Sequence, residues 1–238
     1  MNFTKNTRIL VVAPHPDDES IGCGGLLLKY GPQCDVLVLA DGRKGYNSLD
    51  SVDEEYLVQI RAQELQQATS IASVHQVFSL GIHDYMVAKN KPLVTSFDIS
   101  KYDVILTPNA QERHKDHCVV TKYFEKMRNR QNPGALLYEY EVWSPISAPT
   151  HILDISDVMD AKLSMVSQHR SQIKYVNYCA MTKGLNQYRG AGFNSLYCEA
   201  YRLIPYRTPL QRVYDKLPAR LRCFIRMLRQ PQTIRRKE

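Results

Sequence analysis

Two short segments of the chain combine histidine with aspartate at close spacing. Residues 13–19 read APHPDDE, and residues 113–117 read RHKDH. Imidazole nitrogens and carboxylate oxygens, with no thiolate among them, suit Zn²⁺ or another borderline divalent ion. Either segment alone is typical of a hydrogen-bonded surface turn, but two of them at neighbouring strand ends predict a metal site. The candidate side chains are His15, Asp17, Asp18, His114, Asp116 and His117.

Alternating strands and helices are expected to position these segments. Short apolar runs that end in turn residues are typical of buried parallel strands. They lie at 8–13, 35–40, 76–81 and 103–108, with further strands expected at 135–143 and 151–156. Helical patterns lie at 20–30, 51–72, 117–130 and 158–169. The alternation predicts an α/β fold with a Rossmann-like, mostly parallel sheet and helices on both faces.

The carboxyl ends of the strands are where a sheet of this kind binds its ligands. The two histidine segments follow the first and fourth expected strands. The segments DGRKG at 41–45 and HDY at 83–85 follow the second and third. We therefore expect four polar segments to converge on one edge of the sheet.

Charge is distributed unevenly along the chain. The 238 residues carry a formal net charge of +7. Residues 205–238 contain ten Lys or Arg against two acids, so this segment carries +8 and residues 1–204 carry −1. We expect residues 1–204 to form one domain and residues 205–238 to form a basic tail. A nearly neutral body gives no reason to expect nucleic-acid binding.

The tail contains one amphipathic pattern. In residues 217–230, LPARLRCFIRMLRQ, apolar residues recur at helical spacing and arginines line another side. This predicts a basic amphipathic helix, which could lie on an anionic membrane surface. The other interpretation is a C-terminal helix that packs on the body with its arginines in solvent. The sequence leaves both open, and it indicates no oligomeric state.

Several observations concern the location of the protein. The N-terminal residues lack the apolar region of a signal peptide, and no apolar stretch is long enough to span a membrane. The six cysteines are scattered without a C-x-x-C pair, which favours free thiols in a reducing compartment. We therefore expect a cytoplasmic protein, at the inner face of the membrane if the tail binds there.

The two histidine segments together resemble the PIG-L/LmbE-like family of zinc-dependent N-acetylglucosaminide deacetylases. Further segments similar to that family extend the resemblance over residues 8–204: IRAQE at 60–64, SLGIHD at 79–84, DVILTP at 103–108, residues 154–172, YRG at 188–190 and YCEAY at 197–201. The resemblance implies hydrolysis of the N-acetyl group of an N-acetylglucosamine-type sugar, giving acetate and a free amine. The sugar would belong to a glycoconjugate, such as a lipid-linked or lipopolysaccharide-type glycan.

Site roles are carried over residue by residue. The resemblance implies that His15, Asp18 and His117 hold Zn²⁺, with Fe²⁺ as the alternative in a reducing cytoplasm. It makes Asp17 the general base. His114 would assist the oxyanion or protonate the leaving amine, with Asp116 as its orienting partner.

Substrate contacts are implied at Arg61 and Asp84. Arg61 could equally pair with Glu64 on one helix face, and Asp84 could simply form a turn. The second-strand loop departs from the family pattern, since Arg43 and Lys44 stand where an acid is common. Two cations there would suit an anionic saccharide, with Arg43 as a third substrate contact, or they are simply solvated.

Three alternatives remain at this point. IGCGG at 21–25 and Asp41 suggest a dinucleotide-binding oxidoreductase, but the glycines are not spaced G-x-G-x-x-G and the nearby carboxylates would repel a pyrophosphate. A non-catalytic glycan-binding protein of the same fold is the second. An amidase acting on another substrate, such as a thiol–sugar conjugate, is the third.

Overall fold

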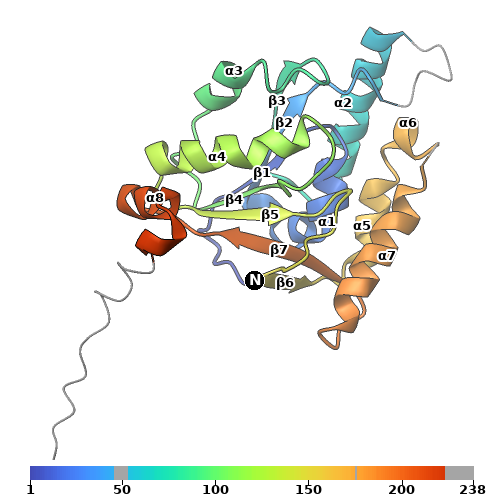
Figure 1. Ribbon diagram of the computed structural model, residues 1–238. Coiled ribbons are helices and arrows are strands. Elements are labelled where there is room, and N and C mark those ends of the chain that lie inside the picture. Colours follow the sequence, from blue (N-terminus) through green and yellow to red (C-terminus); the bar gives the residue numbers. More distant parts are fainter. Residues whose placement is uncertain (46–52, 175, 223–238) are drawn as a thin grey trace, which may run out of the picture. The chain divides into compact units, whose positions relative to one another are not determined.

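The computed structural model describes residues 1–45, 53–174 and 176–222. In these residues seven strands form one sheet in the order β3-β2-β1-β4-β5-β7-β6 (Figure 1). The strands are β1 Ile9–Ala13, β2 Cys34–Ala40, β3 Gln76–Ile82, β4 Val104–Pro108, β5 Leu136–Tyr140, β6 His151–Asp154 and β7 Cys198–Ile204. The first five pair in parallel, whereas β7 is antiparallel to β5 and to β6. The prediction of a mostly parallel sheet is confirmed.

Helices cover both faces of this sheet, as expected (Figure 1). They are α1 Asp18–Tyr30, α2 Glu54–Ile71, α3 Lys91–Ser96, α4 His117–Gln131, α5 Met159–Val166, α6 Arg170–Ile173 and α7 Tyr178–Ala191; a further helix, α8 Pro209–Lys216, belongs to the second of the two units described below. Alternate residues of β1 point into different cores. Val11 packs in the core that includes α1, α2, α5 and α7, while Leu10 packs in the core that includes α3 and α4.

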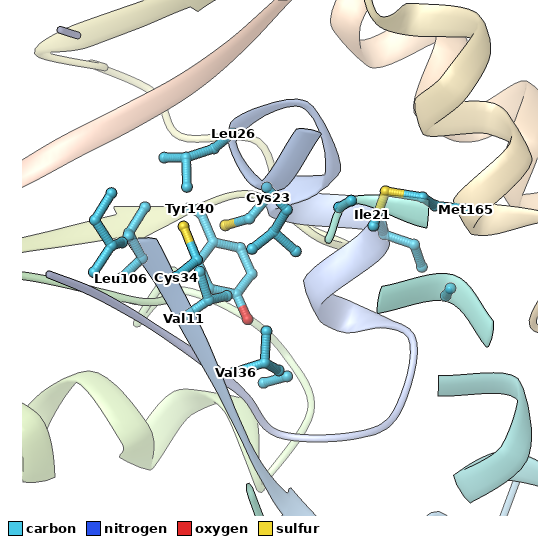
Figure 2. Close-up of a cluster of buried hydrophobic side chains, with 14 of the residues drawn as sticks. Val11, Ile21, Cys23, Leu26, Cys34, Val36, Leu106, Tyr140 and Met165 are labelled. Atoms are coloured by element: carbon cyan, nitrogen blue, oxygen red, sulfur yellow. The ribbon is translucent and has the colours of Figure 1, made fainter. Parts of the chain in front are cut away.

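The core beneath α1 explains the glycines of the IGCGG run. Val11, Val36 and Leu106 of three strands gather there with Cys23, Leu26 and Tyr140 (Figure 2). A Cβ on Gly22 would lie 2.2 Å from Cδ2 of Tyr140, and a Cβ on Gly25 would lie 2.3 Å from Cγ2 of Ile155. The run therefore lies inside a buried helix and permits close packing. It is not a loop that could hold a pyrophosphate.

Some expected elements differ from the observed ones. The strand expected at 135–143 is shorter, Leu136–Tyr140, and the helix expected at 158–169 ends at Val166. Of the helix expected at 51–72, residues 51 and 52 lie outside the described residues; α2 begins at Glu54, and the Asp53 carboxylate accepts the N–H of Tyr56 at 3.0 Å. Five of these elements were not predicted: α3, α6, α7, α8 and β7.

The chain divides into two units, Met1–Ile204 and Pro205–Glu238. In the second unit, a capping box formed by Thr208 and Gln211 begins α8. Of the amphipathic helix expected at 217–230, residues 223–230 lie outside the described part of the chain. Whether the two units behave as a domain and a tail stays a prediction. Among the described residues, no helix is long and apolar enough to cross a bilayer.

Candidate active site

A cavity of about 710 Å³ lies at the carboxyl ends of the parallel strands. The segments that follow β1, β2, β3, β4 and β5 all contribute to its wall, together with α2, α6 and α7. The lining residues are His15, Asp17, Asp18, Lys44, Gly45, Arg61, Asp84, Tyr85, Arg113, His114, His117, Trp143, Ser144, Pro145, Gln172 and Tyr178. The four polar segments therefore meet at one edge of the sheet, as expected.

Three buried donor atoms form a tight triangle at the base of this cavity. Nδ1 of His15 lies 3.2 Å from Nε2 of His117 and 3.5 Å from Oδ2 of Asp18, and the third side, from His117 to Asp18, measures 3.2 Å. Ligands bound at about 2.0–2.2 Å to one tetrahedral ion lie roughly 3.3–3.5 Å apart. The triangle therefore fits three ligands of a small tetrahedral cation.

The electrostatics around His15 support the same conclusion. Burial opposes a charged imidazole, but hydrogen bonds with Asp116 and Asp18 outweigh it and raise the pKa of His15 to about 10. The pKa of Asp18 lies well below its usual range, because the charges and hydrogen bonds of His117 and His15 overcome its burial. These surroundings attract a positive charge to the centre of the triangle.

His114 extends the group without entering the triangle. One ring nitrogen of His15, one of His114 and one of His117 lie within 4.8 Å of one another. This spacing is wider than that of the set containing Asp18. The set of His15, Asp18 and His117 is therefore the better fit to one ion.

The carboxylate of Asp116 contacts His15 rather than His114. Its Oδ2 lies 3.3 Å from Nε2 of His15 and accepts the N–H of Tyr85 at 2.6 Å, while Oδ1 accepts the N–H of Val87 at 3.1 Å. A carboxylate on the outer nitrogen of a ligating histidine orients the ring and raises its basicity. The orienting contact from Asp116 to His114, which we expected, comes instead from its backbone N–H.

That backbone contact determines the tautomer of His114. The N–H of Asp116 donates to Nδ1 of His114 at 3.2 Å, so a neutral ring carries its proton on Nε2. Burial and the charges of His15 and His117 lower the pKa of His114, which favours the neutral ring. The Tyr85 ring stacks on His114 with centroids 5.0 Å apart, and Tyr85 itself has a positive φ of 66°.

Asp17 is held in a strained backbone conformation beside the triangle. Its φ is 144°, a region that L-residues rarely occupy, and its N–H donates to Oε2 of Glu19 at 3.0 Å. Glu19 is anchored in turn by Ser20 and by Nε2 of His169. Burial raises the pKa of Asp17 to about 6, although the nearby Arg61 pulls it down.

Arg61 holds the loops of the first two strands together. Its Nη2 donates to Oδ2 of Asp17 at 3.0 Å and to the carbonyl of Pro16 at 2.7 Å, while Nη1 donates to the carbonyl of Gly42 at 2.9 Å. The alternative pairing with Glu64 is absent among the described contacts. Glu64 instead accepts the N–H and hydroxyl of Ser171. Arg61 therefore positions the Asp17 carboxylate from α2.

The other two residues predicted to contact the substrate differ in placement. Asp84 lines the cavity, and its carboxylate accepts the N–H groups of Gly42 at 2.9 Å and Lys44 at 2.7 Å. The guanidinium of Arg43 pairs with Asp41 and Glu55. Lys44, the next residue, lines the cavity. Arg43 is not among the described residues that line it.

Eight lining residues were not predicted as site residues: Gly45, Tyr85, Arg113, Trp143, Ser144, Pro145, Gln172 and Tyr178. The rings of Trp143 and Tyr178 pack edge to face with centroids 5.4 Å apart. The position of Trp143 at the end of an expected strand could have identified it. Gln172 and Tyr178 lie on helices that the sequence pattern did not reveal.

Comparison with known proteins agrees with this geometry. The family model described as PIG-L: GlcNAc-PI de-N-acetylase matches residues 10–127, which contain both histidine segments. A diacetylchitobiose deacetylase of Thermococcus kodakarensis is 26% identical over 85% of each chain. A probable N-acetyl-alpha-D-glucosaminyl L-malate deacetylase of Bacillus cereus is 27% identical over 69% of this chain and 83% of its own length.

Solved structures share the fold. The N,N'-diacetylchitobiose deacetylase of Pyrococcus horikoshii superposes with a TM-score of 0.70 at 23% identity, covering 87% of this chain and 88% of its own. A hydratase of Pseudomonas putida, GalB, also superposes, with a TM-score of 0.66 at 18% identity, covering 85% of this chain and 98% of its own. The fold alone therefore does not determine the reaction. From the family model and the relatives together, the chain belongs to the PIG-L family.

Proposed function

We propose that this protein is a metal-dependent amide hydrolase that removes the acetyl group from an N-acetylglucosamine-type sugar conjugate, yielding acetate and a free amine. One observation carries the proposal. The triangle of His15, Asp18 and His117 shares a single cavity with Asp17 and His114. A metal centre, a base and a proton donor are the groups that amide hydrolysis requires. The deacetylases among the relatives support the sugar as substrate.

The triangle would hold Zn²⁺, with Fe²⁺ as the alternative, because two imidazole nitrogens and a carboxylate oxygen suit both. When bound, such an ion supplies Lewis acidity, which polarises a carbonyl oxygen and lowers the pKa of an adjacent water. The Asp116 carboxylate keeps His15 turned so that Nδ1 faces the triangle.

Asp17 is the proposed general base. It lies in the cavity next to Asp18, and its pKa of about 6 leaves it ionised at neutral pH. A base whose pKa lies near the working pH accepts a proton effectively. Arg61 and the strained backbone keep the carboxylate in place for the attacking water.

His114 is the proposed proton donor. Because its Nδ1 already accepts a hydrogen bond, its Nε2–H is available to the substrate. That group can stabilise the oxygen that gains negative charge, and the ring can protonate the departing nitrogen once it has itself taken up a proton released from the attacking water. A neutral ring can perform the first task directly.

We retain Arg61, Asp84 and Arg43 as proposed substrate contacts. Arg61 and Asp84 line the cavity, and a carboxylate that accepts two backbone N–H groups still has lone pairs for a sugar hydroxyl. Arg43 lies beside the lining residue Lys44 and would contact only an extended substrate.

An acetate-release screen tests the proposed function. The substrates are free N-acetylglucosamine, diacetylchitobiose, UDP-GlcNAc, a lipid-linked N-acetylated glycan and an N-acetylated thiol–sugar conjugate. We expect acetate from at least one, loss of turnover with a chelator, and recovery with Zn²⁺ or Fe²⁺. A protein that holds stoichiometric metal and releases no acetate from any substrate would instead be a glycan-binding protein.

The cytoplasmic location and the membrane contact through residues 217–230 stay predictions. The concentration of positive charge in the tail supports the contact. Flotation with anionic liposomes, comparing the full chain with a chain truncated after Pro205, tests it. Equal binding of both chains would remove the membrane role.

A further inference from the structure

We propose that Glu112 is a positioning residue for the part of the cavity wall formed by residues 143–145, and that it acts through Trp143. Its carboxylate holds the chain after β5 so that the Trp143 ring meets the hexosamine ring of the substrate. The proposal rests on the deacetylase function and adds to it two residues from different segments of the chain.

The backbone of residues 141–146 depends on side chains for its hydrogen bonds. These residues follow β5 and belong to no helix or strand, so no ladder satisfies their N–H groups. Trp143, Ser144 and Pro145 of this segment line the cavity. The shape of the 143–145 wall is therefore set by the groups that accept these N–H donors.

One carboxylate oxygen accepts three of them. Oε1 of Glu112 accepts the N–H groups of Val142 at 3.3 Å, Trp143 at 2.9 Å and Ser144 at 3.0 Å. Glu112 is only 4% exposed, so little water competes for this oxygen. Consecutive backbone N–H groups that converge on one anion form a concave site with strong, charge-assisted bonds. Glu112 thus determines the course of the chain at Trp143.

Other contacts of the segment hold its neighbouring positions. Asn109 donates from Nδ2 to the carbonyl of Ser144 at 3.2 Å, and Glu141 accepts the N–H of Ile146 at 2.6 Å. Neither contact involves the backbone of Trp143. No second acceptor for the Trp143 N–H is found in the described part of the chain. The carboxylate described above is therefore not duplicated.

The Trp143 side chain is available to a substrate. It is 41% exposed and lines the cavity, and its ring packs edge to face with that of Tyr178. An indole combines a large apolar face with one N–H donor. The C–H face of a hexosamine ring presents apolar surface of matching size, so a correctly placed indole can cover it.

Glu112 also links this wall to the proposed proton donor. It lies two residues before His114, in the segment after β4, and β4 and β5 are parallel neighbours in the sheet (Figure 1). His114 has anchors of its own in the Asp116 N–H and the Tyr85 ring. A change at Glu112 that displaces Trp143 should therefore impair sugar binding more than the chemical step.

Two conservative variants separate the position of the acceptor from its charge. Glu112→Gln keeps a carbonyl oxygen in the place of Oε1, and the buried Oε2 makes no described hydrogen bond that the amide nitrogen would break. Glu112→Asp keeps the charge but withdraws the carboxylate by one carbon–carbon bond, about 1.5 Å. Asp35→Asn is the matched control, since Asp35 is a buried carboxylate that accepts three hydrogen bonds at the amino ends of the strands.

Trp143 is the only tryptophan of the chain, so its fluorescence reports on the wall directly. Emission and acrylamide quenching are measured on the zinc-loaded full chain, as are KM and kcat for acetate release from methyl N-acetylglucosaminide. Kd for this sugar is measured by calorimetry in an Asp17→Asn background, where turnover is suppressed.

We expect Glu112→Asp to shift the emission of Trp143 and increase its quenching. The same variant should raise KM and Kd about fivefold to tenfold and change kcat by less than about twofold, because uniform binding is lost. Glu112→Gln should recover most of the wild-type values. Asp35→Asn should leave the emission and KM unchanged even where it lowers stability.

A double-mutant cycle tests whether Glu112 acts through Trp143. Trp143→Ala alone should raise Kd about tenfold by removing the ring. Adding Glu112→Asp to Trp143→Ala should raise Kd no further, because there is no ring left to place. Additive losses, or unchanged emission and Kd in Glu112→Asp, would overturn the proposal. Equal losses in Glu112→Gln and Glu112→Asp would also overturn it, since the charge would then matter and not the position of the acceptor.

Binding and turnover together distinguish failure of this proposal from failure of the proposed function. Non-additive loss of sugar binding without any acetate release would support the role of Glu112 and overturn the deacetylase function. Acetate release with additive losses would do the reverse. A wild-type protein that binds no N-acetylglucosaminide would overturn both.

Discussion

Asp17 and Asp18 are neighbours in sequence, yet their surroundings assign them different chemistry. Asp18 contacts two histidines, which keep its pKa far below the usual range. Asp17 faces Arg61 and is buried, and its pKa rises to about 6. Two carboxylates with separated pKa values can divide the roles of ligand and base.

Replacing Asp17 tests this division. We expect Asp17→Asn to lower kcat by about 10²–10⁴-fold, the usual contribution of a general base. Metal content, measured by elemental analysis, should stay at the wild-type level because the triangle is intact. A variant with wild-type turnover would contradict the assignment of the base.

Asp116 contacts His15, which belongs to the triangle, so its replacement should change the affinity for the metal. We expect Asp116→Asn to weaken metal affinity by about 10–100-fold, because the amide orients His15 less well. Chelator competition measures the affinity. Excess Zn²⁺ should restore most of the turnover, and an unchanged affinity would show that the His15 contact has no such role.

Helix α1 depends on a buried ion pair as well as on apolar packing. The Glu199 carboxylate of β7 accepts the N–H groups of Gly25 and Leu26 at 2.7 and 3.0 Å, inside the helix. Lys162 of α5 donates to Glu199 at 2.6 Å and to Asn186 of α7 at 2.9 Å. This network joins three helices to the antiparallel end of the sheet and fixes the middle of α1, the helix that begins at Asp18.

Replacement of Glu199 should therefore destabilise the first unit strongly. Removing one partner of a buried pair costs about 3–5 kcal/mol, because the remaining charge of Lys162 stays buried. We expect Glu199→Gln to lower the free energy of unfolding by that amount in urea. Asp157→Asn, which breaks the exposed pair with Lys29, is the matched control and should change it by less than about 1 kcal/mol. Similar effects of the two variants would contradict this account.

A buried carboxylate at the amino ends of the parallel strands, opposite the active site, makes the free energy of unfolding depend on pH. Asp35, at the start of β2, is buried and accepts hydrogen bonds from Tyr102, His75 and Lys101. Burial alone would raise the pKa of Asp35, but these partners lower it. A carboxyl whose folded pKa lies below its unfolded value of about 3.9 stabilises the fold above that pH. The contribution is lost as the pH falls through the folded pKa.

This sign gives a pH-dependent prediction. We expect the wild type to have a larger free energy of unfolding than Asp35→Asn at pH 5. The difference should shrink below about pH 4, because Asp35 of the wild type becomes protonated there and the asparagine of the variant does not titrate. Urea unfolding at each pH measures it, with chelator present so that metal release does not contribute. A difference that grows as the pH falls below about 4 would contradict the assignment.

Local pattern alone predicted the alternating architecture and placed the two histidine segments, with His15, Asp18 and His117 among their six candidates, at the binding edge. The apolar runs 8–13 and 103–108 identified buried parallel strands, and the residues after such strands must lie at the binding edge. The antiparallel β7 and the helix α7 escaped prediction because Glu199 and Arg202 interrupt the apolar run of β7, and Gly184 and polar residues interrupt the pattern of α7.

The partners of the site residues were decided only by tertiary structure. Asp116 contacts His15 across about a hundred residues of chain, and Arg61 reaches Asp17 from a helix on one face of the sheet. Sequence spacing does not encode such contacts, because they depend on how packed helices and loops place side chains in space. The chain's residue types therefore determined which chemistry is available, and packing determined which side chain performs each part.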